Sequence, residues 1–152
     1  MTVISVSYDV FTEAFLDKVR EYDLLELKDY ERSATVDGYM RRAIAAFRSV
    51  CKYDFSTTGD KALREFDISV PESDIDELAD IISEGMVAQW LKPYINQQDF
   101  FEHNLNTKDF TGYSRANLLS KAAEAGKQAQ RNFINMIREY SYVHGDLTTL
   151  HL

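Results

Sequence analysis

Residues 70–93 read VPESDIDELADIISEGMVAQWLKP, and this stretch marks both the start and the limit of a long amphipathic helix. Ser73 follows Pro71 and can cap the helix, while acidic residues in the first turns favour the positive end of the helix dipole. Pro93 lacks a backbone N–H and predicts a kink or an end near Leu91. We expect Trp90 to lie in the core. The apolar stripe of this helix is Ile75, Leu78, Ala79, Ile82, Met86, Trp90 and Leu91, widened by Val87.

Downstream of this stretch the sequence predicts more helix. Residues 94–106, YINQQDFFEHNLN, are typical of a short continuing helix, and residues 107–114, TKDFTGYS, of a loop. Ser114 can cap a last long helix that runs to about Tyr140. The middle of that helix, AAEAGKQA at residues 122–129, has little bulk and predicts the close approach of another helix. Its apolar stripe is Leu118, Leu119, Ala122, Ala125, Gly126, Ala129, Phe133, Met136, Ile137 and Tyr140.

Two further helices are predicted upstream. One starts near Ser7 or Asp9 and runs to about Glu21, and the other is capped by Ser33 and runs to about Val50. Their apolar stripes are Phe11, Ala14, Phe15 and Val19 in the first, and Val36, Tyr39, Met40, Ala43, Ile44, Phe47, Val50 and Cys51 in the second. The sequence therefore predicts a mainly α-helical bundle of four to five helices.

Three local features interrupt this pattern. Gly38 weakens the start of its helix by roughly 1 kcal/mol relative to alanine, which either close helix packing or a later helix start would explain. Residues 52–70 place a Thr-Thr-Gly-Asp turn before the alternating segment 66–70, which predicts a small hairpin or an irregular insertion. The opening residues MTVISV are a candidate for a short arm.

The composition narrows the class of protein. The chain has 152 residues, 45% hydrophobic and 28% charged, so one globular domain is expected. A net charge of −8 argues against a general nucleic-acid binder and against an anionic membrane surface as partner. The charge is uneven, because residues 1–114 carry 12 basic and 22 acidic side chains while residues 115–152 carry 5 basic and 3 acidic. This asymmetry is either chance or an aid to head-to-tail association of identical subunits.

The sequence contains no recognisable catalytic or metal-binding motif. His103, His144 and His151 do not form a zinc-site spacing, and the lone Cys51 ends an apolar stripe, which predicts a buried small hydrophobe. The acidic run ESDIDELAD at residues 72–80 lacks the glycine and the final glutamate of a calcium loop and is better explained as a helix start. We therefore expect no enzyme activity, no cofactor and no metal.

Residues 141–152, SYVHGDLTTLHL, carry one carboxylate and no lysine or arginine, which is unusual for a loose terminus. Apolar groups outside helical stripes either fold back on the core or dock on a partner. We therefore predict a helical domain at residues 1–140 and an extended C-terminal arm at residues 141–152. The predicted interface residues of the arm are Tyr142, Val143, His144, Leu147, Leu150 and Leu152.

A family likeness runs through most of the chain. It extends from VDGYMRRAIAAFRSVCKYDF (residues 36–55), through ISEGMVAQWLKPYINQQDFFEHNLNTKDFTGYSRANLL (82–119), to IREYSYVHGDL (137–147). This pattern resembles the head–tail connector, or neck adaptor, proteins of tailed bacteriophages.

The resemblance implies a helical adaptor that assembles as a homo-oligomeric ring, usually a dodecamer, beneath the portal protein. Such a ring extends the channel, contacts a downstream neck or tail-completion protein, and lets DNA pass without specific binding. The implied location is the neck of the virion, assembled in the host bacterial cytoplasm and without a membrane partner. The resemblance also implies that an extended arm reaches the portal or a neighbouring subunit.

Two alternatives remain open. The first is a small helical regulatory or scaffold module of a phage or prophage that binds another protein through the same apolar surfaces. The second is an enzyme with an unrecognised site, which would require titratable groups to converge in a pocket.

Overall fold

The computed structural model describes residues 3–20, 33–55, 62–104 and 110–144. Within these residues the chain is mainly helical, which confirms the predicted fold class, and it also contains a small two-stranded sheet. The elements in chain order are β1 (Val3–Ser7), α1 (Tyr8–Val19), α2 (Ser33–Phe47), β2 (Glu65–Pro71), α3 (Glu72–Asn104) and α4 (Phe110–His144).

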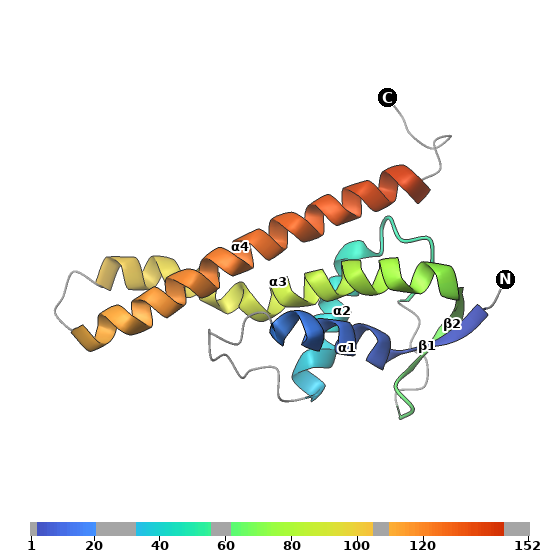
Figure 1. The fold of residues 1–152 in the computed structure, drawn as a ribbon, viewed down its shortest axis with the longest axis horizontal. Coiled ribbons are helices and arrows are strands. Elements are labelled where there is room, and N and C mark those ends of the chain that lie inside the picture. The colour runs from blue at the N-terminus through green and yellow to red at the C-terminus, as the bar shows by residue number, and fades with distance from the viewer. Residues whose placement is uncertain (1–2, 21–32, 56–61, 105–109, 145–152) are drawn as a thin grey trace.

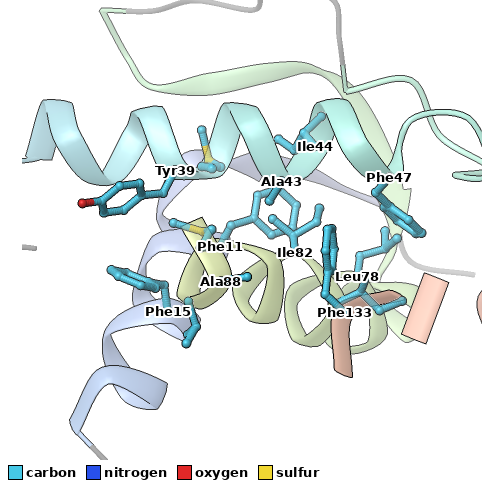
Figure 2. Packing of buried hydrophobic residues seen from close by; sticks show 14 of the residues in the cluster. Phe11, Phe15, Tyr39, Ala43, Ile44, Phe47, Leu78, Ile82, Ala88 and Phe133 are labelled. Carbon is cyan, nitrogen blue, oxygen red and sulfur yellow. The ribbon is translucent and has the colours of Figure 1, made fainter. Parts of the chain in front are cut away.

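The helix α3 is the central element, because α1, α2 and α4 all pack against it. In Figure 1, α1 and α4 lie on opposite sides of the first half of α3. Most residues of the predicted apolar stripes meet in one core, part of which is shown in Figure 2. The labelled residues there are Phe11 and Phe15 of α1, Tyr39, Ala43, Ile44 and Phe47 of α2, Leu78, Ile82 and Ala88 of α3, and Phe133 of α4.

The proline in α3 does not end the helix. The helix continues through Pro93 to Asn104, and Figure 1 shows α3 changing direction where its colour turns from green to yellow. Proline removes one backbone hydrogen bond and crowds the preceding turn, so a continuing helix needs compensation from packing. Ile95, just beyond Pro93, supplies such packing because it lies against Gly126 of α4.

The small-residue middle of α4 does admit a close neighbour, as predicted. A Cβ atom built at Gly126 would lie 3.0 Å from the Cβ atom of Leu91 and 3.1 Å from the Cδ1 atom of Ile95. The start of α4 differs from the prediction, since the helix begins at Phe110 and not at Ser114. The segment predicted as a loop contains no proline, so nothing in its sequence forbids the extra helical turn.

The sheet pairs segments that are far apart in the sequence. β1 and β2 are antiparallel, with Ser5 opposite Ser69 and an irregular step before Ser7 meets Glu65. The predicted strand at residues 66–70 is confirmed, but the hairpin with residues just before it is wrong. The partner of β2 is instead β1, which overlaps the candidate arm MTVISV. Val6 of β1 is buried and belongs to the same core as the inward side chains of β2.

The segment after α2 is irregular, and it still contributes to the core. Phe55 is buried, and its ring centroid lies 5.5 Å from that of Phe11 and 5.2 Å from that of Phe66. Residues 56–61, which include the predicted turn, lie outside the described residues, as do residues 21–32 with the predicted end of the first helix. The irregular insertion is therefore the alternative that fits residues 51–55.

Arg64 joins the sheet to the first two helices. Its guanidinium contacts carboxylate oxygens of Asp9 in α1 and Asp37 in α2, each at 2.7 Å. Its carbonyl oxygen accepts a hydrogen bond from the Tyr8 N–H at 2.8 Å. The neighbouring Ser7 caps α1 with its side chain, which agrees with the predicted helix start near Ser7 or Asp9. Arg64 has a φ of 54°, a left-handed conformation that non-glycine residues adopt rarely, and these contacts hold it there.

Gly38 is explained by neither of the two alternatives. It lies inside α2, whose first residue is Ser33, and a Cβ atom added there would meet nothing within 4 Å. We predict that Gly38→Ala raises the free energy of unfolding by about 0.5–1 kcal/mol, because alanine is the better helix former and no neighbour must move. Thermal or urea unfolding measures this gain, and a lower midpoint than that of the wild type would contradict it.

Candidate functional site

The last turn of α4 carries the described part of the predicted arm. α4 ends at His144, four residues beyond the predicted helix end at Tyr140, so residues 141–144 are helical and not extended. Tyr142 and Val143 are 83% and 73% exposed, which leaves these two large apolar side chains open to solvent. Leu147, Leu150 and Leu152 lie outside the described residues.

This last turn is attached firmly to its own chain. The ring centroid of His144 lies 4.3 Å from that of Tyr140, and its Nε2 atom lies 3.2 Å from a carboxylate oxygen of Glu77 in α3. Tyr140 is buried, packs edge-on against Phe47 at 4.9 Å, and accepts a hydrogen bond from the Lys52 backbone N–H at 3.1 Å. These contacts also explain why the helix extends past Tyr140, since His144 gains two partners only as a helical residue.

A group of titratable side chains lies beneath this turn, around the end of α2. Burial raises the pKa of the Cys51 thiol, and burial likewise raises the pKa of Tyr140 to about 12. The hydroxyl of Tyr53 donates a hydrogen bond to Asp74, which raises the pKa of Tyr53 to about 12. The thiol and both phenols are protonated at neutral pH even at their ordinary pKa values, and the upward shifts move them further from ionisation. The surroundings of Cys51 therefore do not activate its thiol as a nucleophile.

A second polar group lies in an open hollow of about 360 Å³ between α1 and α4. Lys18 of α1 contacts Asp80 at 2.9 Å and Glu84 at 3.0 Å, both in α3. The side-chain amide of Asn132 in α4 donates to the other oxygen of Glu84 at 3.3 Å. Lys18 pairs with both carboxylates, and the contacts of the group link three helices, which is typical of a structural role.

Neither group resembles a metal or cofactor site. Within residues 3–20, 33–55, 62–104 and 110–144, no set of three or more histidine, cysteine or acidic side chains is placed to hold a metal ion. In the same part of the chain, no helix is both long and apolar enough to cross a membrane. Comparison of the chain with protein-family models, with characterised proteins and with solved structures finds no match.

One surface was missed in the sequence. The outward side of α4 carries the half-buried Lys127 and the exposed Arg131, Ile134, Arg138 and Tyr142, which we call the outer stripe. These residues follow one another at steps of 4, 3, 4 and 4, the spacing of a single helix face, so the signal was present. The spacing does not stand out as an apolar stripe because three of these five residues are basic.

Proposed function

We propose that this protein is a structural head–tail adaptor of a tailed bacteriophage, which forms a ring beneath the portal protein and joins it to the tail. The observation that carries the proposal is the pair of exposed side chains Tyr142 and Val143 in a firmly attached last turn of α4. The sequence GDLTTLHL, with three leucines and a single carboxylate, follows directly at residues 145–152. The resemblance described above, which includes residues 137–147, supports the same assignment.

The energetics favour a docked arm only inside an assembly. Burying a large apolar side chain is worth about 1.5–3 kcal/mol, and ordering one residue costs about 1–2 kcal/mol of backbone entropy. Apolar burial of a few side chains therefore does not by itself order the segment 145–152 that follows α4. Backbone hydrogen bonds to a partner and the avidity of many arms in one ring would supply the remainder.

The test measures binding to the portal protein encoded in the same genome. We expect the double variant Tyr142→Ser, Val143→Ser to weaken co-sedimentation with portal rings at least tenfold, since each lost apolar contact is worth about tenfold or more in affinity. Truncation after His144 should weaken it further and abolish the joining of heads to tails. The cut follows His144 and not Tyr140, because removing His144 would also remove its contacts to Glu77 and Tyr140.

Leu63→Ser is the matched control, because Leu63 is a 66% exposed apolar side chain at the start of the sheet region. It should bind portal rings like the wild type, and all variants should keep the wild-type melting temperature. A wild-type chain that fails to sediment with portal rings, or full infectious yield from the truncated chain, would contradict the proposal.

A further inference from the structure

The outward face of α2, with the turn that follows it, is basic although the protein has a net charge of −8. Residues 38–53 contain three arginines and one lysine but no acidic residue. Arg41, Arg42 and Arg48 are exposed, and we call these three arginines the basic face. Among the residues that the structure describes, none of the three has an ion pair. Their charges are therefore available to carboxylates of another molecule.

The basic face is turned away from the core of its own chain. Figure 2 shows Tyr39, Ala43 and Phe47 on the side of α2 that meets α1 and α3. With 3.6 residues per turn, positions 41, 42 and 48 point away from that side. In Figure 1, α2 crosses behind α3, against which it packs, so the basic face lies on the far side of α2.

A partner at this face would also explain Gly38. Gly38 lies three residues before Arg41 and four before Arg42, so it shares their side of the helix. A Cβ atom there would meet nothing within 4 Å, and Ala45, one turn after Arg41, is exposed as well. Glycine inside a helix lowers stability, and packing within the chain does not require it here. Together Gly38 and Ala45 leave a strip without bulky side chains between the arginines, where another backbone can approach closely.

The outer stripe of α4 is a weaker candidate for such a contact. Arg131 donates a hydrogen bond to Gln128 at 2.9 Å, and Lys127 also has a partner. Glu124 precedes Lys127 by three residues and lies on the same side of the helix, where it offsets part of the positive charge. The basic face of α2 has no such compensation among the described residues.

The chain carries the complementary charge at one end. Two exposed carboxylates lie on β2 and two on the first turns of α3, and we call these four the acidic end: Glu65, Asp67, Glu72 and Asp76. None of them has an ion pair within the described part of the chain. Residues 65–91 contain no lysine or arginine. Figure 1 shows β2 leading into the start of α3 at the right-hand end of the molecule.

The acidic end excludes the neighbouring carboxylates that already have partners. Asp74, Glu77 and Asp80 each contact a side chain of their own chain. The helix dipole accounts for Glu72, which lies in the first turn of α3, but it does not account for the two carboxylates of β2. A basic surface of another molecule would give these carboxylates a partner.

We propose that the basic face of one chain docks on the acidic end of a second copy of the same chain. Three cations then meet four carboxylates, and the strip at Gly38 and Ala45 lets the first turns of α3 come close to α2. The two surfaces lie on different parts of the molecule, so the contact is head-to-tail and can repeat from chain to chain. This inference rests on the proposed function, because it assigns the contact between subunits of the ring.

A second copy fits the basic face better than nucleic acid does. The face would also attract phosphate, but tight binding of DNA takes roughly six to ten phosphate contacts, and the face offers three cations. The rest of the chain is acidic and would repel DNA that approached closely. The carboxylates of a second copy carry no such penalty, because they are grouped at one end of the molecule.

Two opposite charge reversals test the contact. The face variant is Arg41→Glu, Arg48→Glu, and the end variant is Asp67→Lys, Asp76→Lys. Each variant alone brings like charges together and should weaken self-association at least tenfold, since close interfacial charge pairs commonly carry that much coupling. Sedimentation velocity at low salt should find both variants monomeric at concentrations where the wild type associates.

An equal mixture of the two variants is the decisive sample. The acidic face of the first then meets the basic end of the second, and the unchanged surfaces still match, so association should return to the wild-type level. Lys92→Glu, Lys121→Glu is the matched control for the face variant, and Glu13→Lys, Glu124→Lys is the control for the end variant. All four control residues are exposed, and both controls should associate like the wild type.

Gly38→Gln tests the close approach without changing any charge. The added side chain has open space in the free chain, so the melting temperature should not fall below that of the wild type. The same side chain would stand between the two subunits, and self-association should weaken at least tenfold. Ser120→Gln, at an exposed position of α4, is the control and should associate like the wild type. This variant keeps the test decisive if a charge reversal fails to fold.

Four results would overturn the inference. The first is a wild-type chain that stays monomeric at millimolar concentration and low salt, and the second is normal association of the face, end and Gly38 variants. The third is a mixture that stays monomeric although each variant melts like the wild type. The fourth is loss of binding to a fluorescent DNA duplex in the face variant without any change in self-association. Portal co-sedimentation reports separately on the proposed function, because it is scored with the Tyr142 and Val143 variant, whose basic face and acidic end are intact.

Discussion

Replacing Trp90 with alanine lowers the free energy of unfolding by about 3–5 kcal/mol, the cost of removing a large aromatic side chain from a packed core. Trp90 is 1% exposed in α3, and its ring meets the ring of Phe15 in α1 edge-on at 6.1 Å. Phe15 in turn meets Tyr39 of α2 at 6.0 Å. The indole of α3 therefore packs against α1, whose Phe15 in turn packs against α2, so we expect its removal to leave a cavity.

Urea unfolding measures this loss. Domains of ordinary size are stable by about 5–15 kcal/mol, so the variant should lose a large share of its stability and still fold at low temperature. Its denaturant slope should match that of the wild type, so that the change reflects stability alone. Tyr142→Ala is the control, because it removes an exposed aromatic side chain and should change stability by less than about 0.5 kcal/mol. A loss below 1 kcal/mol for Trp90→Ala would show that the cavity collapses, contrary to the packing described here.

The helical part of this fold was predictable because its signals are local. Apolar residues at steps of three and four in α1, α2 and α3 predicted residues such as Phe11, Phe47 and Ile82, which are all buried. The same reasoning placed the start of α1 near Ser7 or Asp9 and predicted a close approach along residues 122–129, which occurs at Gly126. In each case the residues that decide the structure are within a few turns of one another.

The features that sequence reasoning missed depend on distant partners. The strand at residues 66–70 was visible from its alternation, but its pairing with Val3–Ser7 depends on a segment some sixty residues away along the chain. The helical state of residues 141–144 depends on Glu77 of another helix, which a local pattern cannot show. Of the kink or end predicted near Leu91 from Pro93, the kink agrees with the change of direction of α3, and the local pattern could not show that packing against α4 lets the helix continue.

The candidate site also combines features that a local pattern shows with features that depend on distant contacts. Tyr142 and Val143 were recognisable because large apolar residues fell outside any stripe, and their exposure agrees with that interpretation. His144 was grouped with them on sequence proximity alone, yet its ring faces Tyr140 and Glu77 of its own chain. The interface role of the arm stays a prediction, and so does the assembly it would serve.

Gly85 shows how strongly one missing side chain determines the packing of three helices. A Cβ atom built there would lie 2.7 Å from the ring of Phe133 in α4 and 2.9 Å from the Cβ atom of Ala43 in α2. Both distances are shorter than real Cβ contacts. The Phe133 ring could turn aside, but the Cβ atom of Ala43 is fixed to its backbone, so relief requires that α2 itself move away from α3.

We therefore predict that Gly85→Val destabilises the protein by about 3 kcal/mol or more, at or above the upper end of the usual cost of overpacking. Gly85→Ala should lose less, because the better helix propensity of alanine returns about 1 kcal/mol. Urea unfolding of these variants also tests whether the close contact with Phe133 causes the loss of stability. Phe133→Leu makes room on the α4 side only, so it should recover part of the loss in Gly85→Ala, with a coupling of about 0.5–3 kcal/mol. Gly38→Ala is the same substitution in a helix with open space around the glycine, and it should raise the free energy of unfolding. Equal effects at both glycines would contradict the close contact of α2, α3 and α4 at Gly85.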